Sequence, residues 1–319
     1  MHRRAALVPL RYVTLPGHGP EDVVADGHGR VLTGVSDGRI FRISGLDDPR
    51  AARVEHVGEI GGRPLGLELL PDGGLLVCDA EGALLRLDTG DGSVRVLTES
   101  AKGEPLRFCS NAVAVPDGTV YFTVSSREFA LGEWLGDLVG HTGTGRLLRL
   151  SPGADTPEVL LEGLQFANGL AVSGCGSFLI VAETGARRLT RYWLTGPRTG
   201  VAEPFVEDLP GYPDNLWRSG PDGPVWVALA GPRVPALDLL HRASPALRRR
   251  AARLALHAPY RPSATAGVLA VDDTGRTLHH LTRRRSGFRM VTSACRTTDG
   301  LLVLGSLSEP GIAVCAAPA

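Results

Sequence analysis

One repeated pattern organises this chain of 319 residues, and its fourth copy reads Asn168-Gly-Leu-Ala-Val-Ser-Gly-Cys-Gly-Ser-Phe-Leu-Ile-Val-Ala182. A polar step at Asn168 precedes an alternating apolar run, a glycine-containing turn follows at 174–176, and a second apolar run completes the unit. Alternation with a period of two is typical of a half-buried β-strand, and the turn predicts that the two runs pair as a hairpin.

The same pattern occurs in five other segments, which are Glu21–Val35, Leu65–Cys78, Asn111–Val124, Asp214–Ala228 and Ser293–Gly305. Most are followed by a third apolar stretch, such as Arg39–Ser44 or Ala83–Asp88, and several by a fourth. Four short strands in units of about 45 residues are typical of β-propeller blades. The sequence therefore predicts an all-β fold, a six-bladed β-propeller with four-stranded blades, as a single domain over residues 1–319. We expect an N-terminal strand at about 11–15 to close the last blade.

Two segments lengthen the period. Residues 125–144 extend blade 3, and residues from about 232 to 262 extend blade 5 and contain a helical pattern. In that pattern Leu247, Ala251 and Leu254 share one face, and four arginines between 248 and 253 lie around the other. The first interpretation is a helix that packs across the propeller rim with its arginines in water. The alternative is a lid, or a helix that faces a membrane or lipid.

Charge and cysteine content narrow the classes of function. The 34 basic and 34 acidic residues give zero net charge, which argues against a nucleic-acid partner. No apolar run approaches the roughly 20 residues that span a bilayer, so we expect no membrane span. Five scattered cysteines without a CxxC pair predict reduced thiols and a cytoplasmic location. The expected partner is a small-molecule substrate, and the sequence does not indicate an oligomeric state.

The polar residues at the start of each repeat form the candidate site, because the innermost strand of each propeller blade starts at the central channel. In chain order the six steps hold Glu21-Asp22, Leu65-Gly66, Asn111, Asn168, Asp214-Asn215 and Ser293. Asp and Asn are poor strand formers, and their buried polar ends need partners. Water and neighbouring backbone could satisfy them. Alternatively, two carboxylates and two carboxamides make an oxygen-rich site for a hard cation such as Ca²⁺, and the lack of His and Cys argues against Zn²⁺ as the preferred ion.

Longer motifs carry a resemblance to a known family. They are Phe166-Ala-Asn-Gly-Leu170, Val181-Ala-Glu-Thr-Gly185, Arg191-Tyr-Trp-Leu194 and Leu209-Pro-Gly-Tyr-Pro-Asp-Asn-Leu216, with Arg63-Pro-Leu-Gly66, Gly145-Arg-Leu-Leu-Arg-Leu150 and Gly305-Ser-Leu307 in support. With these motifs the chain resembles the strictosidine synthase-like branch of the superfamily that includes SMP-30/gluconolactonase (regucalcin) and paraoxonase, over roughly residues 18 to 316.

The resemblance implies a divalent cation in the channel, with Glu21, Asn111, Asn168, Asp214 and Asn215 as its ligands. Ca²⁺ is the expected ion, and Zn²⁺, Mg²⁺ and Mn²⁺ are alternatives. The implied activity is metal-dependent hydrolysis of a lactone or activated ester, with Asp214 as general base and Glu21 as the second candidate for that role. Asn111 would also lie near the substrate.

Three further positions qualify this expectation. Arg107, next to Phe108, resembles a substrate contact of regucalcin-type lactonases, although its spacing to Asn111 is longer here. Ser293 stands where strictosidine synthase has its catalytic Glu, and Leu65 stands where paraoxonases have a His. The alternatives left open are a lyase, isomerase or cyclase that uses the same metal channel, a strictosidine synthase-like condensing enzyme, and a non-catalytic ligand-binding propeller.

Overall fold

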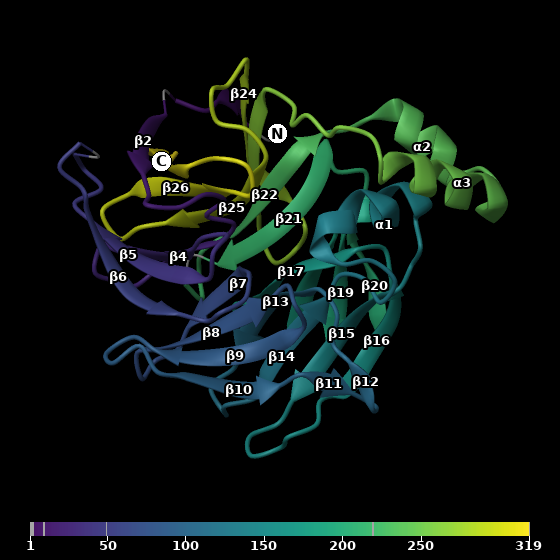
Figure 1. Ribbon diagram of the computed structural model, residues 1–319, viewed down its shortest axis with the longest axis horizontal. Coiled ribbons are helices and arrows are strands. Elements are labelled where there is room, and N and C mark those ends of the chain that lie inside the picture. The colour runs from purple at the N-terminus through teal and green to yellow at the C-terminus, as the bar shows by residue number, and fades with distance from the viewer. Residues whose placement is uncertain (1–2, 9, 49, 219, 319) are drawn as a thin grey trace.

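A computed structural model describes residues 3–8, 10–48, 50–218 and 220–318, and it contains six sheets arranged as the blades of a propeller around a central channel (Figure 1). The predicted six-bladed all-β fold is confirmed. Five blades have four strands, one has five, and a two-stranded hairpin of β11 (Ser100–Ala101) and β12 (Glu104–Pro105) leads into the third blade.

The first three blades follow one another along the chain, each with its innermost strand first. Blade 1 contains β3 (Val23–Ala25), β4 (Val31–Gly34), β5 (Arg39–Ser44) and β6 (Arg53–Glu59). Blade 2 contains β7 (Pro64–Leu69), β8 (Gly74–Asp79), β9 (Ala83–Asp88) and β10 (Val94–Thr98). Blade 3 contains β13 (Cys109–Ala114), β14 (Val120–Val124), β15 (Gly145–Leu150) and β16 (Glu158–Leu164).

The other three blades complete the ring. Blade 4 contains β17 (Ala167–Val172), β18 (Phe178–Glu183), β19 (Arg188–Trp193) and β20 (Ala202–Val206), with the short 3₁₀ helix η2 (Thr184–Ala186) between the second and third strands. Blade 5 contains β21 (Gly211–Arg218), β22 (Val225–Pro232), β23 (Thr265–Val271) and β24 (Thr277–Arg284). Blade 6 contains β25 (Val291–Arg296), β26 (Leu301–Ser306), β27 (Gly311–Ala316) and the N-terminal β2 (Arg11–Thr14).

The N-terminal strands join two different blades. β2 pairs antiparallel with β27 as the outermost strand of blade 6, so the first and last parts of the chain share one sheet. β1 (Arg3–Ala6) pairs parallel with β24 as a fifth strand of blade 5. The repeat pattern does not predict β1, which covers a sheet edge whose backbone groups would otherwise lack partners.

The apolar core lies between neighbouring blades. One buried cluster joins Val24 and Ile40 of blade 1 to Leu75 of blade 2, and another joins Ile180 of blade 4 to Val227 of blade 5. Because each blade is covered on both faces, the middle strands β8 and β18 are buried over their full length. This packing fixes the inner strands and therefore the residues that point into the channel.

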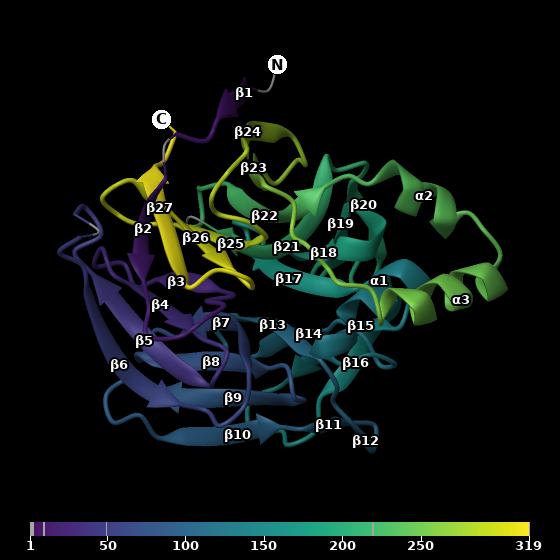
Figure 2. The same cartoon turned by 45° about the horizontal axis from the view of Figure 1, so that its top comes forward.

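Helices occupy the two segments that lengthen the period. Residues 125–144 contain η1 (Leu131–Glu133) and α1 (Trp134–Gly140), and the blade 5 insertion contains α2 (Pro235–His241) and α3 (Pro245–Ala255). α3 packs on α1 beside the propeller (Figure 2). No helix in the described part of the chain is long and apolar enough to cross a bilayer.

The packing face of α3 differs from the expected one. Ala252 is its buried residue, whereas Leu247 and Leu254 are 52% and 73% exposed. Small residues meet where the helices touch, since a Cβ added to Gly140 of α1 would lie 3.4 Å from the Ala252 Cβ. A leucine face could not approach as closely, so α3 packs through Ala252 and not through the face that Leu247 and Leu254 share.

Candidate functional site

The polar residues that β13, β17 and β21 bring to the channel lie in β-bulges, whereas Glu21 and Asp22 directly precede β3. Register shifts leave Ser110-Asn111 opposite one residue of β14, Asn168-Gly169 opposite one residue of β18, and Asp214-Asn215 opposite one residue of β22. A bulge releases a residue from the regular ladder and redirects its side chain. These residue types, unfavourable in a regular strand, therefore occupy the places where the strand is irregular.

Glycine follows the polar residue in β17 because the next inner strand passes too close for a side chain. A Cβ on Gly169 would lie 2.3 Å from the Leu216 backbone nitrogen and 2.6 Å from the Asp214 carbonyl oxygen. The approach of β17 to β21 brings Asn168 and Asp214 together, although 46 positions separate them in the sequence.

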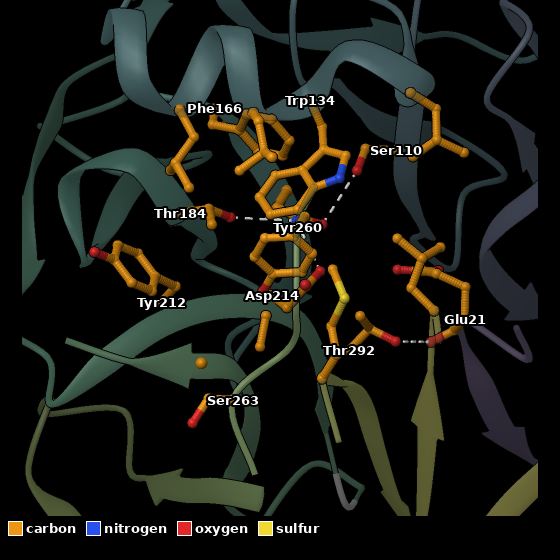
Figure 3. Close-up of a pocket in the computed structure, with 18 of the residues that line it drawn as sticks. Glu21, Ser110, Trp134, Phe166, Thr184, Tyr212, Asp214, Tyr260, Ser263 and Thr292 are labelled. Atoms are coloured by element: carbon orange, nitrogen blue, oxygen red, sulfur yellow. Dashed lines mark hydrogen bonds between the residues drawn. The ribbon is translucent and has the colours of Figure 1, made fainter. Parts of the chain in front are cut away.

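Asn168 is the centre of a hydrogen-bonded group on the channel axis. Its Nδ2 donates to Asp214 Oδ1 at 2.7 Å and to Thr184 Oγ1 at 3.2 Å. Its Oδ1 accepts from Ser110 Oγ at 3.1 Å. Figure 3 shows this group, with Glu21 and Thr292 beside it, around one cavity, hereafter the chamber.

Asn111 and Asn215 form a second row behind Glu21. The Leu170 backbone N–H donates to Asn111 Oδ1 at 3.1 Å, Asn111 Nδ2 donates to Asn215 Oδ1 at 3.0 Å, and Asn215 Nδ2 donates to Glu21 Oε1 at 3.0 Å. All are buried. Of the five predicted metal ligands, Glu21, Asn168 and Asp214 line the chamber, whereas Asn111 and Asn215 orient Glu21 from outside it.

The electrostatics of this group favour a bound cation. Burial raises the pKa of Glu21 well above its ordinary value, and the carboxylates of Asp214 and Asp22 raise it further, whereas Arg63 and the Asn215 hydrogen bond lower it. Burial likewise raises the pKa of Asp214 to about 8, against the hydrogen bond from Asn168. Glu21 Oε2 is buried without a hydrogen-bond partner.

A hard divalent cation fits these donors, because it would neutralise two buried carboxylates and use the unpartnered oxygen of Glu21. In the described residues no three His, Cys, Asp or Glu side chains converge to hold a metal. The candidate ligands here are two carboxylates, Glu21 and Asp214, with the amide oxygen of Asn168. That composition favours Ca²⁺ or another oxygen-seeking ion over a thiolate or imidazole metal.

Asp22, the neighbour of Glu21, is held by the protein itself. Its Oδ1 accepts from the Val23 backbone N–H at 2.8 Å and from the Ser293 hydroxyl, and its Oδ2 accepts from the Leu67 backbone N–H at 2.8 Å. Burial still raises the pKa of Asp22 to about 6, against these hydrogen bonds. Asp22 thus ties together blades 1, 2 and 6, a role that the sequence pattern did not separate from that of Glu21.

The chamber has a polar floor and apolar walls, with a volume of about 290 Å³. Helix α1 and the blade 5 insertion supply much of the wall, where Trp134 and Tyr260 meet edge to face with ring centroids 4.9 Å apart. Phe108 and Phe166 meet in the same way at 5.4 Å. The remaining apolar wall residues include Leu65, Leu131, Leu138, Val234, Leu237, Met290 and Leu307.

Several chamber residues were not predicted from the sequence. Ser110 and Thr184 bond to Asn168, and Thr292 Oγ1 donates to the Glu21 carbonyl oxygen at 2.6 Å. Ser110 directly precedes a predicted ligand, Asn111, and this adjacency is the signal that could have identified it. Trp134 and Tyr260 give no such signal, because they come from insertions outside the repeat, whereas Phe108 and Phe166 directly precede the inner strands β13 and β17.

Arg107 lies outside the chamber. It is exposed and lines a neighbouring groove with Arg63 and Arg146, and Leu131 borders both cavities. The cause is the positive φ of 56° at Phe108, which reverses the chain direction so that Phe108, not Arg107, is buried against the chamber. A contact of Arg107 with substrate stays a prediction, and only for a ligand that extends beyond Leu131.

Comparison with known proteins places this fold and site in a family. A family model described as strictosidine synthase matches residues 111–197, and one described as strictosidine synthase-like, N-terminal, matches residues 5–43. Strictosidine synthase-like 10 of Arabidopsis thaliana is 32% identical, over 95% of this chain and 87% of that protein. The chain belongs to the strictosidine synthase-like family. This membership confirms the resemblance carried by the sequence motifs.

Other strictosidine synthase-like proteins match over a smaller share of their length. Strictosidine synthase-like 13 of Arabidopsis thaliana is 34% identical over 70% of this chain, which spans 60% of that protein. Among solved structures, a gluconolactonase from Xanthomonas campestris has a TM-score of 0.68 at 15% identity, covering 97% of this chain and 89% of its own. Regucalcin from Agrobacterium tumefaciens, a calcium-binding protein, has a TM-score of 0.64 at 14% identity, covering 97% and 95%. At these identities the two comparisons show that the chain shares its fold with these proteins, and nothing further.

Proposed function

We propose that this chain is a divalent-metal-dependent hydrolase of an apolar lactone or activated ester. The observation that carries the proposal is the buried, unpartnered Glu21 Oε2 at the floor of an apolar chamber, beside Asn168 and Asp214. A buried carboxylate oxygen without a partner is costly, and a cation compensates that cost. The names of the structural neighbours, a gluconolactonase and a calcium-binding regucalcin, agree with this assignment.

Glu21, Asn168 and Asp214 would hold the cation, with Ca²⁺ proposed first and Zn²⁺, Mg²⁺ or Mn²⁺ as alternatives. When bound, such an ion polarises a substrate carbonyl and stabilises the oxyanion that develops on it. Asn215 and Asn111 keep Glu21 oriented through the chain of amide hydrogen bonds.

Asp214 acts as the general base, with Glu21 as the second candidate. Asn168 Nδ2 holds Asp214 Oδ1 at 2.7 Å, which leaves Oδ2 to accept a proton from the attacking water. The water oxygen bonds to the carbonyl carbon, the bond from that carbon to the leaving oxygen breaks, and the proton passes to the leaving oxygen. A lactone gives a hydroxy acid, and an ester gives an acid and an alcohol.

The walls select the substrate. Trp134, Phe166 and Tyr260 offer aromatic surface and few hydrogen-bond partners, so hydroxyl groups of a sugar lactone would be poorly satisfied there. An apolar acyl or aryl group gains by leaving water for such a surface. We therefore expect a more apolar substrate than that of the structural neighbour named as a gluconolactonase.

Metal content and turnover test the proposal together. Protein purified without chelator is analysed by elemental mass spectrometry and assayed on a panel of aryl esters and apolar lactones, with and without chelator. We expect about one divalent ion per chain, chelator-sensitive turnover, and loss of turnover in Asp214→Ala but not in Asp299→Ala, an exposed aspartate. No ion and no uptake of added calcium or zinc, or full activity in Asp214→Ala, would overturn it.

The alternatives give different results in the same assays. A lyase, isomerase or cyclase would need the ion but release no hydrolysis product, and a non-catalytic propeller would bind apolar esters without turnover. The condensing alternative lacks support, because fully buried Ser293, at the position of the implied catalytic Glu, bonds to Asp22 rather than lining the chamber.

A further inference from the structure

The outer surface of the blade 5 insertion has an unusual charge. Six of the 34 Lys and Arg residues lie between residues 239 and 271, where the sequence has no Asp or Glu. The rest of the chain, with 28 basic and 34 acidic residues, is net acidic. Helix α3 and the segments beside it, with Arg242 before the helix and Arg261 after it, therefore form a cationic region on a protein of zero net charge, whereas α2 itself contains Asp238 and no Lys or Arg.

Exposed apolar side chains gather on α2, on α3 and in the segments beside them. Among the described residues eleven large hydrophobic side chains are exposed, and six of them lie between 234 and 260. All four exposed leucines belong to this set, with Leu239 at 71% and Leu254 at 73% exposure. Such a concentration is a mark of an interaction surface, whereas single exposed residues are not.

One face of α3 packs against the protein, and the opposite face is exposed. Arg248 and Ala252, one turn apart, face the protein, and Arg248 Nη1 donates to the His141 carbonyl oxygen at 3.3 Å. The opposite face presents Leu247, Arg250 and Leu254 in one row, with Arg249 and Arg253 beside it. Figure 1 shows α2 and α3 projecting from the side of the propeller, and Leu247, Arg250 and Leu254 are exposed there.

We propose that the outer face of α2 and α3 docks on a bilayer of anionic phospholipid, parallel to its plane. Arginines bond to lipid phosphates, and the leucine side chains enter the boundary between headgroups and acyl chains. The same insertion supplies Val234 and Tyr260, which line the chamber and are also 45% and 43% exposed, so docking brings this part of the chamber wall next to the lipid.

Other partners fit this face less well. Nucleic acid would use the arginines but leave the leucines in water. A second copy of the chain would set arginines against arginines. An acidic protein would satisfy the charge, yet it gives no reason for the wall of an apolar chamber to lie beside the same helices. The bilayer satisfies the arginines, the leucines and the position of the chamber together.

The test is sedimentation with phosphatidylcholine vesicles, with and without phosphatidylglycerol. We expect binding to the anionic vesicles that weakens with salt. Arg249→Ser/Arg250→Ser/Arg253→Ser should lose at least about tenfold in partitioning, since each arginine near an anionic surface contributes about fivefold. The matched control, Arg53→Ser/Arg95→Ser/Arg296→Ser, removes three exposed arginines elsewhere and should lose much less.

The leucines have their own pair of variants. Leu247→Ser/Leu254→Ser should lose about tenfold in partitioning, and Val94→Ser/Val96→Ser on the outer strand of blade 2 should not. A polarity-sensitive dye on Leu254→Cys, in a Cys175→Ser background, should shift to the blue on anionic vesicles, and the same dye on Val96→Cys should not shift. All these positions are exposed, so unchanged thermal unfolding verifies that each variant is folded.

Docking is separable from hydrolysis. Asp214→Ala, and wild type in chelator, should bind vesicles as tightly as the untreated protein. No preference for anionic vesicles, an equal loss in the two arginine variants, tighter binding to an RNA duplex than to vesicles, or a leucine-dependent dimer in solution would each overturn the proposal.

Discussion

Glu21 and Asp22 are adjacent in sequence, yet they belong to two regions of the channel with opposite properties. Asp22, in the buried middle, accepts three hydrogen bonds from blades 1, 2 and 6. Glu21, at the floor of the chamber, keeps one buried oxygen without a partner. A buried carboxylate that accepts hydrogen bonds from several blades stabilises the fold. A buried carboxylate with an unpartnered oxygen is available to bind a ligand.

Loss of the Asp22 hydrogen bonds should reduce the free energy of unfolding more than any other change proposed here. Asp22→Ala leaves three donors without an acceptor, and at roughly 1–3 kcal/mol for each, this change should lower the free energy of unfolding by about 3–9 kcal/mol. Ser293→Ala, which removes one of the three, should cost about 1 kcal/mol. Chemical denaturation measures both. If Asp22→Ala unfolds at the wild-type midpoint, Asp22 does not tie the blades together.

Gly169→Ala should disturb the chamber region of the channel and leave the Asp22 region intact. Its new Cβ would meet backbone of β21 at 2.3 Å, so the strands must move apart at a cost of about 3 kcal/mol. Metal binding should suffer as well, because Asn168 and Asp214 meet across this contact, whereas the Asp22 bonds should persist. Gly132→Ala is the control, because a Cβ at that position meets nothing within 4 Å and its backbone is not in the left-handed region. Retained metal affinity in Gly169→Ala would contradict this account.

Glu21→Gln should lower the affinity for metal and raise the unfolding temperature of the metal-free protein. Removal of one of two buried carboxylates lowers the affinity for metal at least about tenfold. In chelator, however, the same variant should unfold at a higher temperature than wild type, because an unpartnered buried charge is gone. Differential scanning calorimetry, with and without calcium, measures the crossover. A Glu21→Gln protein that is less stable than wild type in chelator would show that Glu21 behaves as Asp22 does.

The smallest effect concerns the helices rather than the channel. His141 of the α1 turn stacks on His241 of α2 with ring centroids 4.0 Å apart. Burial, His241, Arg248 and Arg188 lower the pKa of His141 to about 4. Burial, Arg248 and Arg187 lower the pKa of His241, whereas the Leu138 carbonyl and Asp238 raise it.

Both imidazoles are thus neutral in the folded protein, and the unfolded chain binds protons more readily. The stability that they contribute is present above pH 6.5 and is lost as the pH falls toward 4. His141→Asn/His241→Gln, in which Asn tolerates the left-handed backbone at 141, should show a smaller drop in unfolding temperature from pH 7 to 5. If the unfolding temperature falls equally in the variant and in wild type, the two histidines do not cause this pH dependence.

The repeat itself could be predicted closely from the sequence. Strands expected at Arg39–Ser44 and Ala83–Asp88 have those limits in β5 and β9, because a period-two pattern bounded by turns depends only on local residues. The polar residues at the strand starts also identified Glu21, Asn168 and Asp214 as channel residues, since their poor strand propensity marks the bulges at Asn168 and Asp214 and the start of β3 after Glu21.

The rest depends on tertiary contacts that no local pattern encodes. Whether Asn111 faces the chamber or stands behind Glu21 is set by the direction of its bulge and by its bond to Asn215. The exposed leucines of α3 follow from the contact of Ala252 with Gly140 on another blade's insertion. One left-handed residue, Phe108, decides the position of Arg107.

The pairing of β2 with β27 also affects the order of synthesis. Blade 6 takes its outermost strand, β2, from before blade 1 and its other three strands from after blade 5, so β2 is made well before the strand with which it pairs. Blades 1 to 4 can form while the ribosome is still at work, because domains assemble from the N-terminus as they emerge. Ring closure has to follow the emergence of Gly311–Ala316, and until then the edge of β2 is exposed to chaperones and to other nascent chains.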